Sequence, residues 1–153
     1  MDERALALMR LTGYALAQGL WQVTDGAPLC TFALWEADGL PDRQVARVDA
    51  ESVEVSMATA RRNLGEVERL VRWAIAAEGE VRTPNGGTYG AIRVEFGATD
   101  TALEGEALYF FRKAPFAMVQ GPVLRILGGE AGEELRSAVI QGMHVTRKEE
   151  AEA

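Results

Sequence analysis

The chain has 153 residues, of which 48% are hydrophobic and 25% are charged, and its formal net charge is −7. This length and composition fit one globular domain with a single core, and they exclude a disordered chain. The negative charge argues against nucleic-acid binding, because it repels phosphate and no cluster of lysine or arginine is longer than a pair.

The first predicted element is a helix from Asp2 to about Gln18. Arg10 is the only charged residue between Ala5 and Trp21, so the helix is apolar on most sides. Such a helix must be buried on more than one side, either deep in the fold or against another copy of the chain. Its main apolar stripe, at helical spacing, consists of Leu6, Met9, Gly13, Leu16 and Leu20.

A β-hairpin is predicted after this helix. Turn residues occupy 24–28, and a strand over 29–36 leads through a second loop to a partner strand over 44–48. The first strand is apolar on both faces, with Phe32 and Leu34 on one face and Ala33 and Trp35 on the other.

The longest periodic segment, residues 49–79, is predicted to form one central helix. Asp49 is a good N-cap and Gly79 a natural C-terminal stop, while Ser56 offers a cap for a shorter helix. On the polar side, Glu68 precedes Arg72 by four residues, the spacing of a helical ion pair. The apolar stripe follows steps of four and three, and consists of Val53, Met57, Ala60, Leu64, Val67, Val71 and Ala74.

The C-terminal half is predicted to form four strands and a third helix. The first two strands flank Asn85-Gly86, the strongest short hairpin signal. The third strand is apolar on both faces at its centre, and the fourth is interrupted at Gly121-Pro122. The strands are predicted at 80–83, 89–96, 106–113 and 116–127, the helix at 133–144, and a charged, frayed tail at 146–153.

Together these elements predict a single α+β domain over residues 1–145, with the order α-β-β-α-β-β-β-β-α. Short hairpin links favour a mostly antiparallel, layered sheet of about five to six strands with three helices packed on it.

Two glycine-rich segments resemble nucleotide-binding loops only superficially. Residues 128–132 precede a helix as a phosphate loop would, but the glutamates at the start of that helix would repel a phosphate. Gly86-Gly87 leads into a strand, so the dinucleotide fingerprint fails in its context. We therefore predict no cofactor.

No catalytic or metal-binding constellation stands out either. The only histidine, His144, has no nucleophile motif to serve, and is expected to contact the last carbonyl groups of its helix. The single cysteine, Cys30, excludes a disulfide framework and a cysteine-rich zinc site. Paired-carboxylate catalysis stays open for Glu95, Glu104 and Glu106, which could converge across neighbouring strands. Their position on solvated strand edges is the simpler explanation for these acidic residues. We predict no catalytic residues and no metal.

The cellular location of the protein is predicted by elimination. The first residues are acidic where a secretory signal would be basic, and no apolar run approaches the roughly eighteen residues of a membrane span. We expect a cytoplasmic location and no membrane contact.

The functional prediction depends on the two strands that are apolar on both faces, at 29–36 and 106–113. Both faces of the sheet must be covered near them, by the three helices or by a second subunit. We expect a non-enzymatic, bacterial-type interaction protein that self-associates or docks a protein partner, as an adaptor or immunity-type domain would. The alternative is a small-molecule-binding protein or enzyme with a pocket between sheet and helices. The candidate interaction surface consists of Trp35, Tyr109, Phe111 and Arg112.

Overall fold

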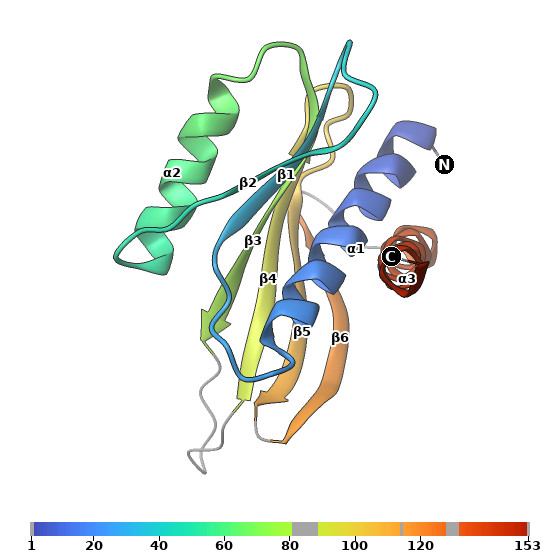
Figure 1. Cartoon of the computed structure of the whole chain (residues 1–153). Coiled ribbons are helices and arrows are strands. Elements are labelled where there is room, and N and C mark those ends of the chain that lie inside the picture. Colours follow the sequence, from blue (N-terminus) through green and yellow to red (C-terminus); the bar gives the residue numbers. More distant parts are fainter. Residues whose placement is uncertain (1, 81–88, 114, 128–131, 153) are drawn as a thin grey trace.

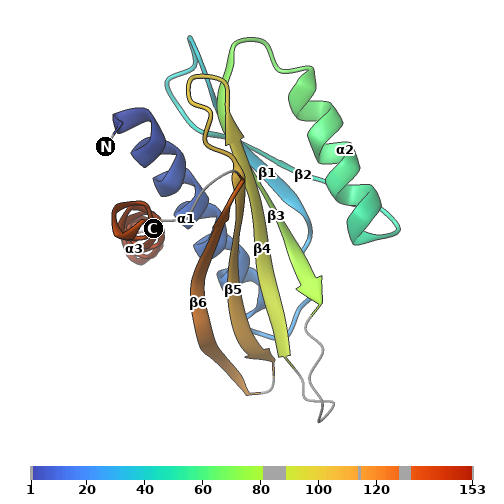
Figure 2. The same ribbon diagram turned by 180° about the vertical axis from the view of Figure 1, so that it is seen from behind.

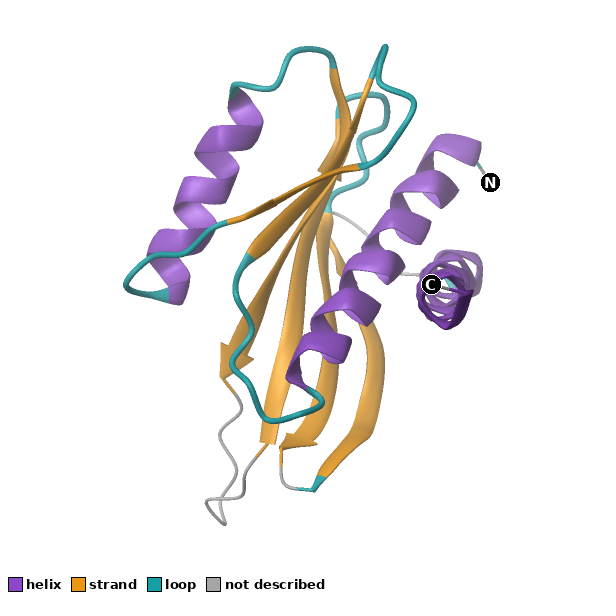
Figure 3. Cartoon of the chain, viewed as in Figure 1, coloured by secondary structure: helices purple, strands orange, loops and turns teal. Residues whose placement is uncertain are grey.

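A computed structural model describes residues 2–80, 89–113, 115–127 and 132–152, and it shows an α+β fold. Three helices and six strands follow the predicted order, with helices packed on an antiparallel sheet (Figures 1 and 3). The elements are α1 Glu3–Val23, β1 Phe32–Ala37, β2 Gln44–Arg47, α2 Val53–Gly65, β3 Leu70–Glu80, β4 Tyr89–Ala98, β5 Gly105–Lys113, β6 Phe116–Ile126 and α3 Glu133–Glu152.

The sheet has the strand order β2-β1-β3-β4-β5-β6, so β2 and β6 are its edges. Side chains alternate between its two faces along each strand. One face packs against α1 and α3 and is called the α1/α3 face; the other packs against α2 and is called the α2 face (Figure 1). On β3, Ala74 and Ala76 point to the α1/α3 face, while Trp73, Ile75 and Ala77 point to the α2 face.

Helix α1 is buried on two sides, as its composition predicts. It packs against β3, β4 and β5 on one side and against α3 on another. Asp2 caps its first turn, because its carboxylate accepts a hydrogen bond from the backbone N–H of Arg4 at 3.0 Å. The chain's own third helix therefore covers the second apolar side of α1.

The α1/α3 interface depends on two glycines. A side-chain carbon at Gly13 would overlap the carbonyl group of Val139, with the carbonyl carbon only 2.8 Å away. At Gly142 it would overlap the carbonyl group of Arg10 in the same way, again with the carbonyl carbon at 2.8 Å. Because both neighbours are backbone, the two helices can approach this closely only where neither carries a Cβ.

The prediction of one central helix over 49–79 is wrong. Helix α2 ends at Gly65 with Glu66 as its C-cap, and residues 70–80 form β3, which lies between β1 and β4 in the sheet. Arg69 bends the chain with a positive φ of 57°, a conformation uncommon outside glycine. The run Leu70–Ala77 is apolar on nearly every side, so it fits a helical stripe and a strand buried on both faces equally well.

The start of α2 also differs from the predicted start. Its N-cap is Ser52, whose hydroxyl accepts a hydrogen bond from the backbone N–H of Val55 at 3.2 Å. Asp49, the predicted cap, is exposed and lies outside the helix. The helix buries Met57, Ala60 and Leu64 against the α2 face of the sheet.

The C-terminal elements correct three further boundaries. Strand β6 continues through Gly121-Pro122, where the prediction placed a break, but its pairing with β5 is irregular at these two residues. Helix α3 extends to Glu152, through most of the segment predicted as a frayed tail. Of the predicted strand 80–83 only Glu80 is described, as the end of β3, and the turn 84–87 lies outside the described residues.

Candidate functional site

An apolar groove lies between the C-terminal half of α1, helix α3 and strands β5 and β6. Its volume is about 400 Å³. The described residues that line it include no Asp, Glu, Lys or Arg; they are Ala17, Leu20, Trp21, Thr24, Tyr109, Phe116, Met118, Gly121, Pro122, Ile140, Met143 and His144. Its floor is the α1/α3 face of the sheet, and its walls are the two helices.

Large apolar side chains in this groove are unusually exposed. Trp21 is 57% exposed, Met118 52% and Ile140 42%, although each of them lines the same groove. Single exposed apolar residues are common on proteins, but three large ones around one concavity form a patch of the kind that marks a binding surface.

The groove exists because of how α3 approaches the rest of the molecule. The glycine contacts described above hold α3 against α1, and α3 reaches the sheet at β6 (Figure 2). Leu135, Ala138 and Val139 fill the side of α3 that faces the core. The next turn, with Ile140, Met143 and His144, lines the groove.

Three polar side chains border the groove. Thr24 is occupied locally, since its hydroxyl donates a hydrogen bond to the carbonyl oxygen of Trp21 at 2.9 Å. His144 was predicted at a helix C-terminus, but α3 continues to Glu152, so the histidine has no free terminal carbonyls to contact. It is exposed at the groove, where Tyr109 of β5 also lies.

The four residues of the predicted interaction surface do not form one surface. Tyr109 lines the groove, and Phe111 lies on the same face of β5 but is only 1% exposed, as part of the core beneath it. Trp35 faces the opposite side, against α2, because it is opposite Trp73 in the β1–β3 pairing. Arg112 also points to the α2 face, opposite Tyr89. Their role in binding stays a prediction, and only Tyr109 belongs to the groove.

The strands that are apolar on both faces are covered unequally. Strand β1 is enclosed by this chain, with Phe32 and Leu34 in the α1/α3 core and Ala33 and Trp35 in the α2 core. On β5, Phe110 and Glu106 lie on the side of the sheet away from α3, and Figure 2 shows no helix in front of β4, β5 and β6. Leu108 on this open side is nevertheless only 9% exposed. Three of the exposed large apolar side chains, Trp21, Met118 and Ile140, therefore gather in the groove, whereas others such as Val119 are exposed outside its lining.

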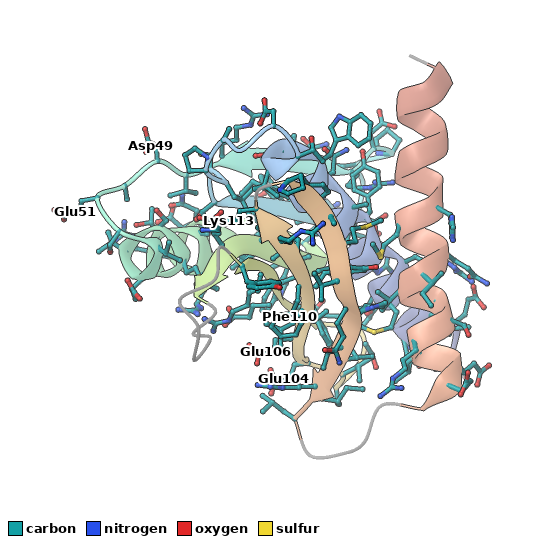
Figure 4. All side chains as sticks on the ribbon, turned by 90° about the horizontal axis from the view of Figure 1, so that it is seen from below. Asp49, Glu51, Glu104, Glu106, Phe110 and Lys113 are labelled. Atoms are coloured by element: carbon teal, nitrogen blue, oxygen red, sulfur yellow. The ribbon has the colours of Figure 1, made fainter. Side chains whose placement is uncertain are left out.

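The three candidate carboxylates gather beside this open face. Glu95 and Glu106 are directly opposite each other on β4 and β5, and both line, with Glu104, a second hollow of about 430 Å³. Figure 4 labels Glu104 and Glu106, which lie near each other. Two of these carboxylates, Glu95 and Glu106, accept hydrogen bonds from arginine side chains. Arg61 donates two hydrogen bonds to Glu95, at 2.6 and 2.8 Å, and Glu106 accepts from Arg93 at 3.0 Å and from Arg125 at 3.4 Å.

These contacts favour a structural role for Glu95 and Glu106. The hydrogen bonds to Glu95 raise the pKa of the Arg61 guanidinium, which therefore stays charged at every ordinary pH. A carboxylate that acts as a general acid needs a neighbourhood that favours its neutral form, and a guanidinium does the opposite.

The predicted ion pair between Glu68 and Arg72 does not form, because the two residues do not share a helix. From β3, the Arg72 guanidinium donates instead to Glu36 of β1 at 3.2 Å and to Asp100 at 3.4 Å. Cys30 precedes β1, where its thiol lies 3.7 Å from the carbonyl oxygen of Thr31 and 3.8 Å from that of Val48. Both sets of contacts link neighbouring segments of the fold.

Among the described residues, no three or more His, Cys, Asp or Glu side chains are grouped so as to hold a metal ion. Within the same residues, no helix has the length and apolar character needed to cross a membrane. Comparison with protein-family models, with curated proteins and with solved structures gives no match. The candidate site therefore depends on geometry and chemistry alone.

Proposed function

We propose that this chain is a non-enzymatic, cytoplasmic protein-interaction domain that holds an apolar segment of a protein in the groove. The observation that supports this function is the exposure of Trp21, Met118 and Ile140 around a groove whose described lining carries no Asp, Glu, Lys or Arg. Water contact with such side chains is unfavourable by roughly 25 cal/mol per Å² of apolar area, so covering them stabilises a complex. Tryptophan is also the residue most enriched at the energetic centres of interfaces.

A second candidate function is the binding of a small apolar molecule. The groove volume of about 400 Å³ lies within the range of ligand pockets, roughly 300–1,000 Å³. His144, Thr24 and Tyr109 could orient the polar end of such a ligand. The apolar lining of the groove suits this candidate as well, so an experiment must separate the two functions.

Site-specific photo-crosslinking in growing cells separates these functions. A benzoylphenylalanine residue replaces Met118 in one variant and Val45 in the other. The two positions are well matched, because both lie on edge strands, β6 and β2, and their side chains are 52% and 63% exposed.

We expect irradiation to join the Met118 variant to a protein, seen as a gel band of higher mass, with no such band from the Val45 variant. A mass increase of a few hundred daltons at position 118 would instead support the small-molecule function. Equal crosslinking at both positions, or none at either, would contradict both functions.

A further inference from the structure

We draw no further inference here: the strongest candidate, the apolar groove between α1, α3, β5 and β6, carries none beyond the proposed function, because nothing in the structure shows which partner covers it.

Discussion

Replacement of Gly13 by alanine tests the architecture that creates the groove. Alanine favours a helix by roughly 1 kcal/mol relative to glycine, so the substitution would stabilise an isolated α1. In the folded chain, the added carbon would overlap the carbonyl group of Val139 and lie 3.1 Å from the backbone nitrogen of Met143. Since no rotamer change can move backbone atoms away, α3 must shift.

Overpacking of this kind typically lowers stability by about 1–3 kcal/mol, and contact with backbone favours the upper part of that range. After the helix-propensity gain, we expect Gly13→Ala to lower the free energy of unfolding by about 1–2 kcal/mol. With a urea m-value near 2 kcal/mol/M, the unfolding midpoint should fall by roughly 0.5–1 M at unchanged m.

Two further variants make this measurement decisive. Gly65→Ala is the control, because nothing lies within 4 Å of a carbon added there, and its propensity gain should leave the protein as stable or more stable. The double variant Gly13→Ala, Gly142→Ala should lose less than the sum of the single losses, since helices separated by one methyl accommodate the second more easily. The reasoning fails if Gly13→Ala is as stable as the wild type while Gly65→Ala behaves as expected.

Three other experiments test separate parts of the structure. Phe111→Ala should lower the free energy of unfolding by about 3–5 kcal/mol in urea titrations, because the ring is only 1% exposed; a loss below 1 kcal/mol would contradict its place in the core. Ser52→Ala should lower the melting temperature through loss of about 1 kcal/mol of capping energy, whereas Asp49→Ala should not. A larger loss from Asp49→Ala than from Ser52→Ala would show that the helix begins at Asp49. A double-mutant cycle of Arg61→Met and Glu95→Gln should give a coupling of at most about 1 kcal/mol, reduced by salt, since both side chains are partly exposed. Because the pKa of Arg61 is raised, its share of this coupling is present below its ordinary pKa and is lost only at strongly alkaline pH, so stability measured from pH 7 to 9 should show no loss from it.

The sequence was informative where turn residues limited an apolar run to the length of a strand, or where one periodicity excluded the other. Alternation identified the two faces of β1, and the helical stripe of α1 identified a helix buried on two sides. It was misleading at β3, where nearly every residue from Leu70 to Ala77 is apolar and both periods fit. The element order was nevertheless predicted, because a short strand was expected at 80–83 and β3 takes its place in the order, ending at Glu80.

A pocket between sheet and helices was the predicted alternative, but the residues that line the groove were beyond prediction from the sequence. Trp21 fell past the predicted end of the first helix, and its exposure depends on α3, more than 110 residues later in the chain. Gly13 and Gly142 set the distance between the helices, but a glycine in a helix does not reveal which backbone it will meet. Tyr109 was chosen for its aromatic ring. Only the strand registers show that it faces the groove while Trp35 and Arg112 point to the other face of the sheet.

Hydroxyl-radical footprinting of the intact protein tests most directly whether the groove is a covered surface. Oxidation of Trp21 and Met118 is compared between the purified protein at submicromolar concentration and the same protein inside cells, with Leu40, 50% exposed, as the reference. We predict that both groove residues oxidise readily when dilute and are protected at least severalfold in cells, while Leu40 is unchanged. Equal oxidation of Trp21 and Met118 in both conditions would contradict the proposal that this surface binds a partner.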